Sequence, residues 1–222
     1  MKLNRHYRDP GEMPTTLPLF PLVGALLLPR RPIQLTVFEP RYLAMLDDAL
    51  GGERLIGMIQ PAAGDLAHGT SPELYPIGCA GRVVQYAEIG DGRCFLTLMG
   101  VARFRLEEEL TAMTPYRIVR VSYDSFAADF VEGHGEPEVD RKALVAALRN
   151  FARANDVKID WDDVQKAPNE ALVNALSMMS PYGAKEKQAL LEAPDLKSRA
   201  EILVAISQIE LAHGSDSPRH LH

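Results

Sequence analysis

The stretch LPLFPLVGALLLPRRPIQLTVFEPRYLAMLDDAL, residues 17–50, decides the fold because it joins two strand patterns to one helix pattern. The strand candidates are residues 17–23 and 33–38, and a proline-rich turn separates them. Pro40 suits a first helical position, since its missing N–H would have no partner there. Gly51-Gly52 is a natural end for the helix. The pattern therefore predicts a β-rich unit interrupted by a single helix.

Further strand patterns follow as far as residue 123. They cover residues 54–59, 81–89, 93–99, 103–107 and 116–123. Gly90-Asp91-Gly92 lies between two of them and has the composition of a hairpin turn. Several short strands at close spacing indicate a small β-barrel or sandwich.

The second half of the chain has a helical period. Residues 124–139 are acidic and rich in turn formers, which predicts a linker. Helix patterns then cover residues 141–154, 168–180, 185–193 and 195–211. The predicted fold class is α+β, with a β-rich domain at 1–123, a linker at 124–139, a helical bundle at 140–212 and a disordered tail at 213–222.

Charge and composition exclude several classes of function. The net charge is −6, and residues 1–139 carry 13 Lys+Arg against 18 Asp+Glu, which argues against nucleic acid as a partner. The longest apolar run, residues 22–28, is too short to cross a bilayer. The first residues lack the apolar core of a signal peptide, so we expect a cytoplasmic location.

No cofactor or metal is expected. The six histidines lack the spacing of a structural zinc site. Cys79 and Cys94 read as small buried residues that stay reduced, although a disulfide between them is geometrically possible.

Motifs of catalysis are missing from the sequence. GxxxxGK[ST], GxGxxG, GxSxG and HExxH do not occur. Ser177, Ser180 and Ser198 lie near helical charges, but helix capping is the simpler explanation for Ser198. The acidic pair Asp162-Asp163 beside Trp161 is read as a solvated helix start rather than as a ligand patch. We therefore expect no enzyme activity.

Two stretches carry a family resemblance. Residues 17–50, with LPLFPL and FEPRY, and residues 77–121, with G-x-x-G-R-V, D-G-R, G-x-x-R-F-R and P-Y, resemble the N-terminal domain of the Lon protease family. EKQALLEAPDLKSRAEIL is similar to the helical extension of stand-alone bacterial members. The resemblance implies a PUA-like β-fold followed by a helical bundle, a domain that in Lon engages unfolded or tagged substrates. Neither the ATPase module nor the Ser-Lys protease domain of Lon is recognisable in this sequence.

The helix that begins at Pro40 is the predicted binding element. Leu43, Leu46 and Leu50 recur at helical spacing and should face the core. Arg41 and Met45 lie four residues apart and should share an exposed face, with Tyr42 between this face and the core. Arg41, Tyr42 and Met45 are therefore the candidate polypeptide-binding residues, and a purely structural role for them is the alternative.

Other side chains are expected to hold the fold. Phe20, Phe38 and Phe104 should be buried, because aromatic side chains dominate protein cores. Glu39, Arg41 and Arg103 are candidates for internal ion pairs that fix the helix on the β-rich unit.

The leading functional hypothesis is recognition of polypeptide in protein quality control, with a protease or chaperone as a further partner. The alternative is an RNA-binding PUA-like module that uses arginines on the predicted strands, namely Arg82, Arg103, Arg105, Arg117 and Arg120. A small hydrolase with an unrecognised site is a third reading.

Overall fold

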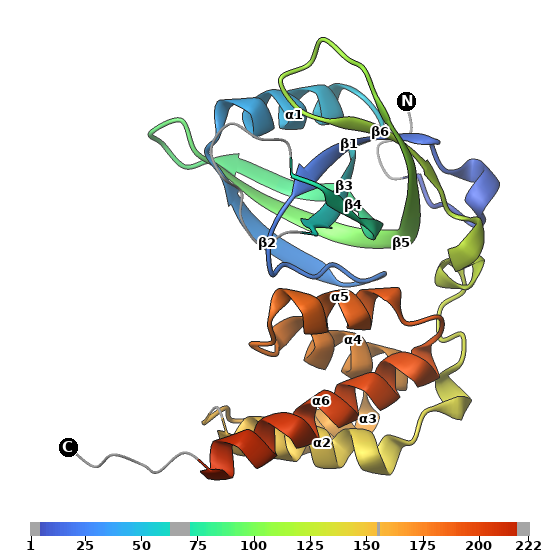
Figure 1. The fold of residues 1–222 in the computed structure, drawn as a ribbon, viewed down its shortest axis with the longest axis vertical. Coiled ribbons are helices and arrows are strands. Elements are labelled where there is room, and N and C mark those ends of the chain that lie inside the picture. Colours follow the sequence, from blue (N-terminus) through green and yellow to red (C-terminus); the bar gives the residue numbers. More distant parts are fainter. Residues whose placement is uncertain (1–4, 63–71, 155, 217–222) are drawn as a thin grey trace. The chain divides into compact units, whose positions relative to one another are not determined.

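The computed structural model describes residues 5–62, 72–154 and 156–216 (Figure 1). The chain divides into two compact units, Met1–Glu132 and Gly133–His222. Each unit is described by itself below.

The first unit is a six-stranded sheet with the strand order β2-β5-β4-β3-β1-β6. The strands are β1 (Thr16–Pro21), β2 (Pro32–Val37), β3 (Leu55–Pro61), β4 (Leu74–Glu88), β5 (Cys94–Leu110) and β6 (Ile118–Ser122). The β1–β3 pair is parallel and the other pairs are antiparallel. Because β6 pairs with β5 as well as with β1, the pairings run from β1 through β3, β4, β5 and β6 back to β1.

Strands β4 and β5 are longer than the sequence patterns predicted. The predicted strands 93–99 and 103–107 are parts of the one strand β5, and β4 begins seven residues before the predicted start at residue 81. Gly100 lies inside β5 because a loop crosses closely over it, and a Cβ at this position would be 2.0 Å from the carbonyl oxygen of Leu28. The glycine thus permits a backbone contact and does not mark a strand end.

Side chains from several strands form the hydrophobic core of the first unit. Its buried members include Leu17 and Leu19 from β1, Phe104 from β5 and Val119 from β6. Burial of Phe20 and Phe104 is confirmed, but the prediction for Phe38 is wrong, because its side chain is 62% exposed. Strand β2 ends with Val37 facing the core, so alternation along an extended chain turns Phe38 outward.

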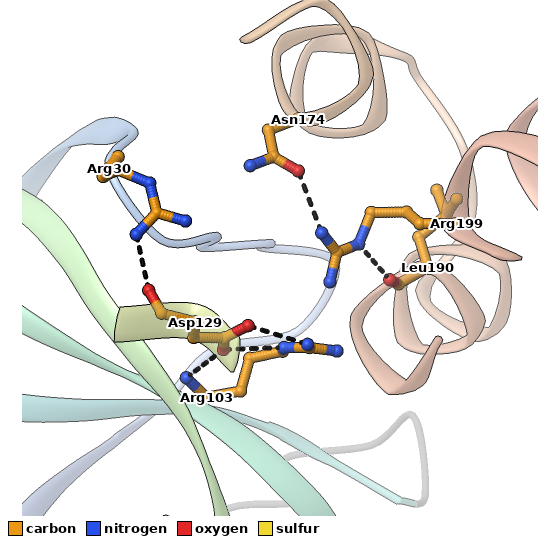
Figure 2. A network of polar contacts seen from close by, with 6 residues as sticks. All are labelled: Arg30, Arg103, Asp129, Asn174, Leu190 and Arg199. Atoms are coloured by element: carbon orange, nitrogen blue, oxygen red, sulfur yellow. Dashed lines mark hydrogen bonds and ion pairs between the residues drawn. The ribbon is translucent and has the colours of Figure 1, made fainter. Parts of the chain in front are cut away.

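The predicted linker at residues 124–139 is largely ordered in short 3-10 helices. Asp124–Phe130 forms η2, which belongs to the first unit, and Glu136–Glu138 forms η3 in the second unit. Within η2 the carboxylate of Asp129 accepts hydrogen bonds from the backbone N–H and the guanidinium of Arg103 (Figure 2). The residues of the predicted linker are thus partly ordered by contacts with β5, and the boundary between the two units lies within them, after Glu132.

The second unit is helical. Its helices are α2 (Arg141–Ala154), α3 (Trp161–Lys166), α4 (Asn169–Met179), α5 (Ala184–Glu192) and α6 (Leu196–Asp216). Between residues 140 and 211 the described positions contain no strand, as predicted. Helix α6 continues to Asp216, so the first four residues of the predicted disordered tail are helical, and residues 217–222 lie outside the described residues.

The helices of the second unit enclose a buried polar contact. Arg199 on α6 donates hydrogen bonds to the carbonyl oxygen of Leu190 and to the side-chain oxygen of Asn174 (Figure 2).

No helix in the described part of the chain is both long enough and apolar enough to span a membrane. The cytoplasmic location stays a prediction.

Candidate functional site

Helix α1 (Pro40–Gly51) packs on the first unit through Tyr42, Met45, Leu46 and Ala49. These positions recur at three- and four-residue spacing and so form one face of the helix. The ring of Tyr42 lies 4.6 Å from the ring of Phe20 on β1, centroid to centroid. Burial raises the pKa of the Tyr42 hydroxyl above its ordinary value.

The predicted exposed face that would join Arg41 to Met45 is wrong. Met45 is 0% exposed and Tyr42 is 6% exposed, so both are part of the core packing. Arg41 is exposed, but its guanidinium is 2.7 Å from the carboxylate of Glu39 and lies over the ring of Tyr42. Glu39 and Arg41 thus pair with each other and do not form the predicted internal ion pair that would fix the helix on the β-rich unit. The pair lies at the surface, at the start of α1.

A different face of α1 lines a groove. Leu43 and Leu50 are only partly buried, and Asp47 between them is exposed. Together with the β4–β5 hairpin they enclose a hollow of about 270 Å³, which we call the α1–hairpin groove. Its lining consists of Leu43, Leu46, Asp47 and Leu50 from α1 and Tyr86, Glu88, Gly90, Gly92, Arg93 and Cys94 from the hairpin.

The hairpin wall was missed by the sequence reasoning. Tyr86 lies on β4 and is 50% exposed, although it pairs across the sheet with the buried Leu96. The available signal was the hairpin itself, since Tyr86 and Glu88 alternate toward a turn that the sequence did predict. What the sequence could not indicate is that this hairpin lies next to α1.

Turn geometry leaves the tip of the hairpin open. Gly90, Asp91 and Gly92 all have positive φ, and the N–H of Arg93 donates to the carbonyl oxygen of Gly90 at 3.0 Å. Nothing lies within 4 Å of the place where a side chain of Gly90 or Gly92 would begin. Arg93 reaches back to Asp91, with 3.3 Å between nitrogen and oxygen.

Tyr116 holds α1 in place through a hydrogen bond to Asp48. The hydroxyl of Tyr116, just before β6, donates a hydrogen bond of 2.5 Å to the carboxylate of Asp48. Burial and this hydrogen bond raise the pKa of Tyr116 to about 12. Asp48 is therefore occupied by a contact within the unit, whereas its neighbour Asp47 lines the groove.

The arginines proposed for RNA binding mostly contact groups within the first unit. Arg103 pairs with the buried Asp129, and Arg117 and Arg120 pair with Glu109 and Glu108. The guanidinium of Arg82 lies 5.0 Å from the centre of the Tyr7 ring. Carboxylates thus neutralise three of these positive charges.

The second unit has an open hollow of about 480 Å³ beside Trp161. Arg149 lies over the indole ring at 5.1 Å from its centre, and Arg153 and Asp156 also line the hollow. Cys79 and Cys94 are buried and are not joined by a disulfide. Within the described ranges no cluster of histidine, cysteine or carboxylate residues could hold a metal ion.

Comparison with known proteins identifies the family. The family described as the ATP-dependent protease La (LON) substrate-binding domain matches residues 16–207. The chain belongs to this family. Its Lon relatives include Lon protease 2 of Sorangium cellulosum (strain So ce56), 30% identical over 207 residues, and Lon protease 2 of Myxococcus xanthus, 27% identical over 205 residues. These alignments cover 89% and 88% of this chain but only 25% and 24% of the relatives.

Solved structures of Lon N-terminal domains have the same fold. The Lon N-terminal domain protein from Xanthomonas campestris is 25% identical, with a TM-score of 0.61 over 86% of this chain and 98% of that one. The N-terminal domain of the Mycobacterium avium complex Lon protease has a TM-score of 0.62 at 16% identity, over 87% of this chain and 98% of that one. The chain therefore spans about a quarter of the curated Lon proteases it matches, and nearly the whole of each Lon N-terminal domain.

Proposed function

We propose that this chain is a non-catalytic protein that recognises unfolded or tagged polypeptides in protein quality control, together with a protease or chaperone. The observation that carries the proposal is the α1–hairpin groove, an apolar hollow on a unit that belongs to a substrate-binding family. In terms of fold, we propose a PUA-like barrel for the first unit and a helical bundle for the second.

The size of the groove suits part of a polypeptide. Small-molecule sites commonly enclose about 300–1,000 Å³, whereas this groove holds about 270 Å³ and is open at the hairpin tip. One or two apolar side chains of a client would fill it. The partly buried Leu43 and Leu50 and the exposed ring of Tyr86 would gain contacts from such side chains.

The groove replaces the site first predicted on α1. Of Arg41, Tyr42 and Met45, none lines the groove, and two are buried in the core. We assign Tyr42 and Met45 the role of holding α1 in place. Arg41 stays a predicted contact for a client at the start of the helix.

The RNA-binding alternative has less support. RNA-binding surfaces need cationic side chains that are free to meet phosphates. Three of the five arginines in that hypothesis, Arg103, Arg117 and Arg120, have carboxylate partners. The surplus of acidic over basic residues in 1–139 would further repel phosphates.

A binding experiment tests the proposed function. The probe is fluorescein-labelled α-lactalbumin, kept unfolded by reduction and alkylation with iodoacetamide, which adds no charge, and fluorescence anisotropy measures its affinity for the purified protein. We expect binding to the unfolded probe and none to the same protein in its folded, disulfide-bonded form. Tyr86→Ser should weaken binding by about tenfold or more, since truncating a central contact residue commonly has such an effect. Tight binding of an RNA oligonucleotide without binding of the unfolded probe would contradict the proposal.

A matched control separates the groove from the rest of the surface. Val84 lies on the same strand as Tyr86 and is also 50% exposed, but it does not line the groove. Val84→Ser should therefore leave the affinity unchanged. If Arg41→Glu abolishes binding and Tyr86→Ser does not, the client contacts the start of α1 instead of the groove.

A further inference from the structure

The rim of the α1–hairpin groove is acidic. Asp47 contributes a carboxylate from α1, and Glu88 contributes one from β4 on the opposite wall. Both are exposed, and neither forms an ion pair with any described residue. They are therefore available to a ligand.

The groove's own positive charge is already compensated. Among the described residues that line it, Arg93 is the only basic one, and its guanidinium lies 3.3 Å from the carboxylate of Asp91. With Asp91 included, the groove and its hairpin tip carry three carboxylates, on Asp47, Glu88 and Asp91, against one guanidinium. The local balance is negative by two charges.

The end of α1 adds to this negative potential. The carbonyl groups at the C-terminus of a helix carry a partial negative charge that favours cations. Leu50 in the last turn lines the groove, and no basic residue lies in that turn. The helix end thus supplies no cation of its own, and a cation from a ligand would be stabilised there.

We propose that the α1–hairpin groove selects polypeptide segments in which a lysine or arginine lies beside one or two apolar side chains. The apolar side chains contact Leu43, Leu50 and Tyr86, and the cation lies between Asp47 and Glu88. This inference rests on the proposed function and names its substrate class. Asp91 carries the side chain at the hairpin tip, and Gly90 and Gly92 on either side of it leave open space through which the client backbone can continue past the hairpin.

Three peptides of equal length test the selection. Each is a fluorescein-labelled ten-residue peptide with the same Leu-Leu-Phe core, flanked on each side by lysine in the first, glutamine in the second and glutamate in the third. We expect the full chain to bind the lysine peptide about tenfold more tightly than the glutamate peptide, with the glutamine peptide between them. The preference should shrink in 0.5 M NaCl, because exposed charges are screened at that ionic strength.

Charge-reversal variants of Asp47 and Glu88 test whether the lysine of the peptide binds between these two carboxylates. Glu88→Lys, alone or with Asp47→Lys, should remove the preference for the lysine peptide and favour the glutamate peptide instead. Glu107→Lys on β5 is the matched control, since Glu107 is an exposed glutamate of the same unit that does not line the groove. It should keep the order of the three affinities. If a reversal variant fails to fold, the milder double variant Asp47→Asn with Glu88→Gln replaces it. This variant should bind the lysine and glutamine peptides with equal affinity.

The outcomes separate the two proposals. Equal affinity for all three peptides would overturn the charge selection and leave polypeptide recognition standing. A lysine preference that survives both groove reversals would also overturn it, because the cation would then lie elsewhere. If no peptide binds and the unfolded α-lactalbumin does not bind either, both proposals are wrong.

Discussion

Arg103 and Asp129 form an ion pair that is almost wholly removed from water. Their side chains are only 3% and 8% exposed, and the two-pronged contact has nitrogen–oxygen distances of 2.8 and 2.9 Å. The guanidinium also lies 4.4 Å from the centre of the Phe126 ring. The contact holds the chain at η2 against β5, where the sequence predicted a linker. No local pattern indicates this, because the two residues are 26 positions apart.

Removing one partner of this pair should be costly. Asp129→Ala leaves the Arg103 guanidinium buried without its carboxylate, which typically lowers the free energy of unfolding by about 3–5 kcal/mol. Urea denaturation followed by circular dichroism measures the change. Asp124→Ala, at an exposed position of the same η2, is the control and should stay within about 0.5 kcal/mol of the parent protein. Equal stability of both variants would show that the pair contributes little to folding.

Burial of Tyr116, together with its hydrogen bond to Asp48, raises the pKa of its hydroxyl and makes the stability of the first unit depend on alkaline pH. The folded protein keeps the tyrosine proton up to about pH 12, whereas an unfolded chain releases it near the ordinary value of 10.0. The stabilisation is therefore complete below pH 10 and is lost as the pH rises toward 12.

A tyrosine-to-phenylalanine change tests this dependence. Between pH 10 and 12 the free energy of unfolding of the parent protein should fall more steeply than that of Tyr116→Phe, by at most about 1.4 kcal/mol per pH unit. Burial also raises the pKa of Tyr123. Because Tyr123 is present in both proteins, its contribution to the pH dependence of stability is the same in both. Tyr86→Phe, at the exposed position on β4, is the control and should follow the parent curve. Parallel curves for Tyr116→Phe and the parent would contradict the assignment.

At the scale of elements, helix α1 could be predicted but its orientation could not. Pro40 and Gly51-Gly52 set its ends through local backbone preferences, and the observed helix spans Pro40–Gly51. Its apolar residues occupy most of its circumference, since Tyr42, Leu43, Met45, Leu46 and Leu50 leave two possible inward faces. Packing against Phe20 and the sheet selects the face with Tyr42 and Met45. That selection turns Leu43 and Leu50 toward the groove.

The two faces of α1 should respond differently to substitution. Met45→Asp places a carboxylate where the side chain is 0% exposed, so the first unit should lose most of its stability. Arg41→Glu removes an exposed pair with Glu39, which is worth about 0–1 kcal/mol, and a contact of the guanidinium with the Tyr42 ring, which is worth about 0.5–1 kcal/mol. Thermal melts of the single variants measure both effects. A stable Met45→Asp protein would mean that the outer face of α1 is the one first predicted from the sequence.

At the scale of the whole molecule, the order of elements follows from the sequence, but the groove does not. The change from strand period to helical period separates the β-rich part from the helical part, and the observed boundary between the units lies after Glu132. Strand and helix patterns are local, so they place each element along the chain. The groove depends on α1, which ends at Gly51, lying beside a hairpin that begins only at Leu74, and this proximity depends on the sheet order.

The last prediction concerns catalysis by the molecule as a whole. The sequence has no phosphate-binding loop, and two of the three serines considered for serine–lysine chemistry, Ser177 and Ser180, are buried. Ser177 is fully buried, and the hydroxyl of Ser180 donates to the carbonyl oxygen of Leu176 at 2.7 Å. Neither could reach a peptide bond of a client. We therefore expect the purified protein neither to hydrolyse ATP nor to cleave unfolded casein, measured by phosphate release and by gel electrophoresis. Activity that co-purifies with the protein and is lost in Ser177→Ala or Ser180→Ala would contradict the non-catalytic proposal, whereas activity unchanged in both variants would point to a contaminating enzyme.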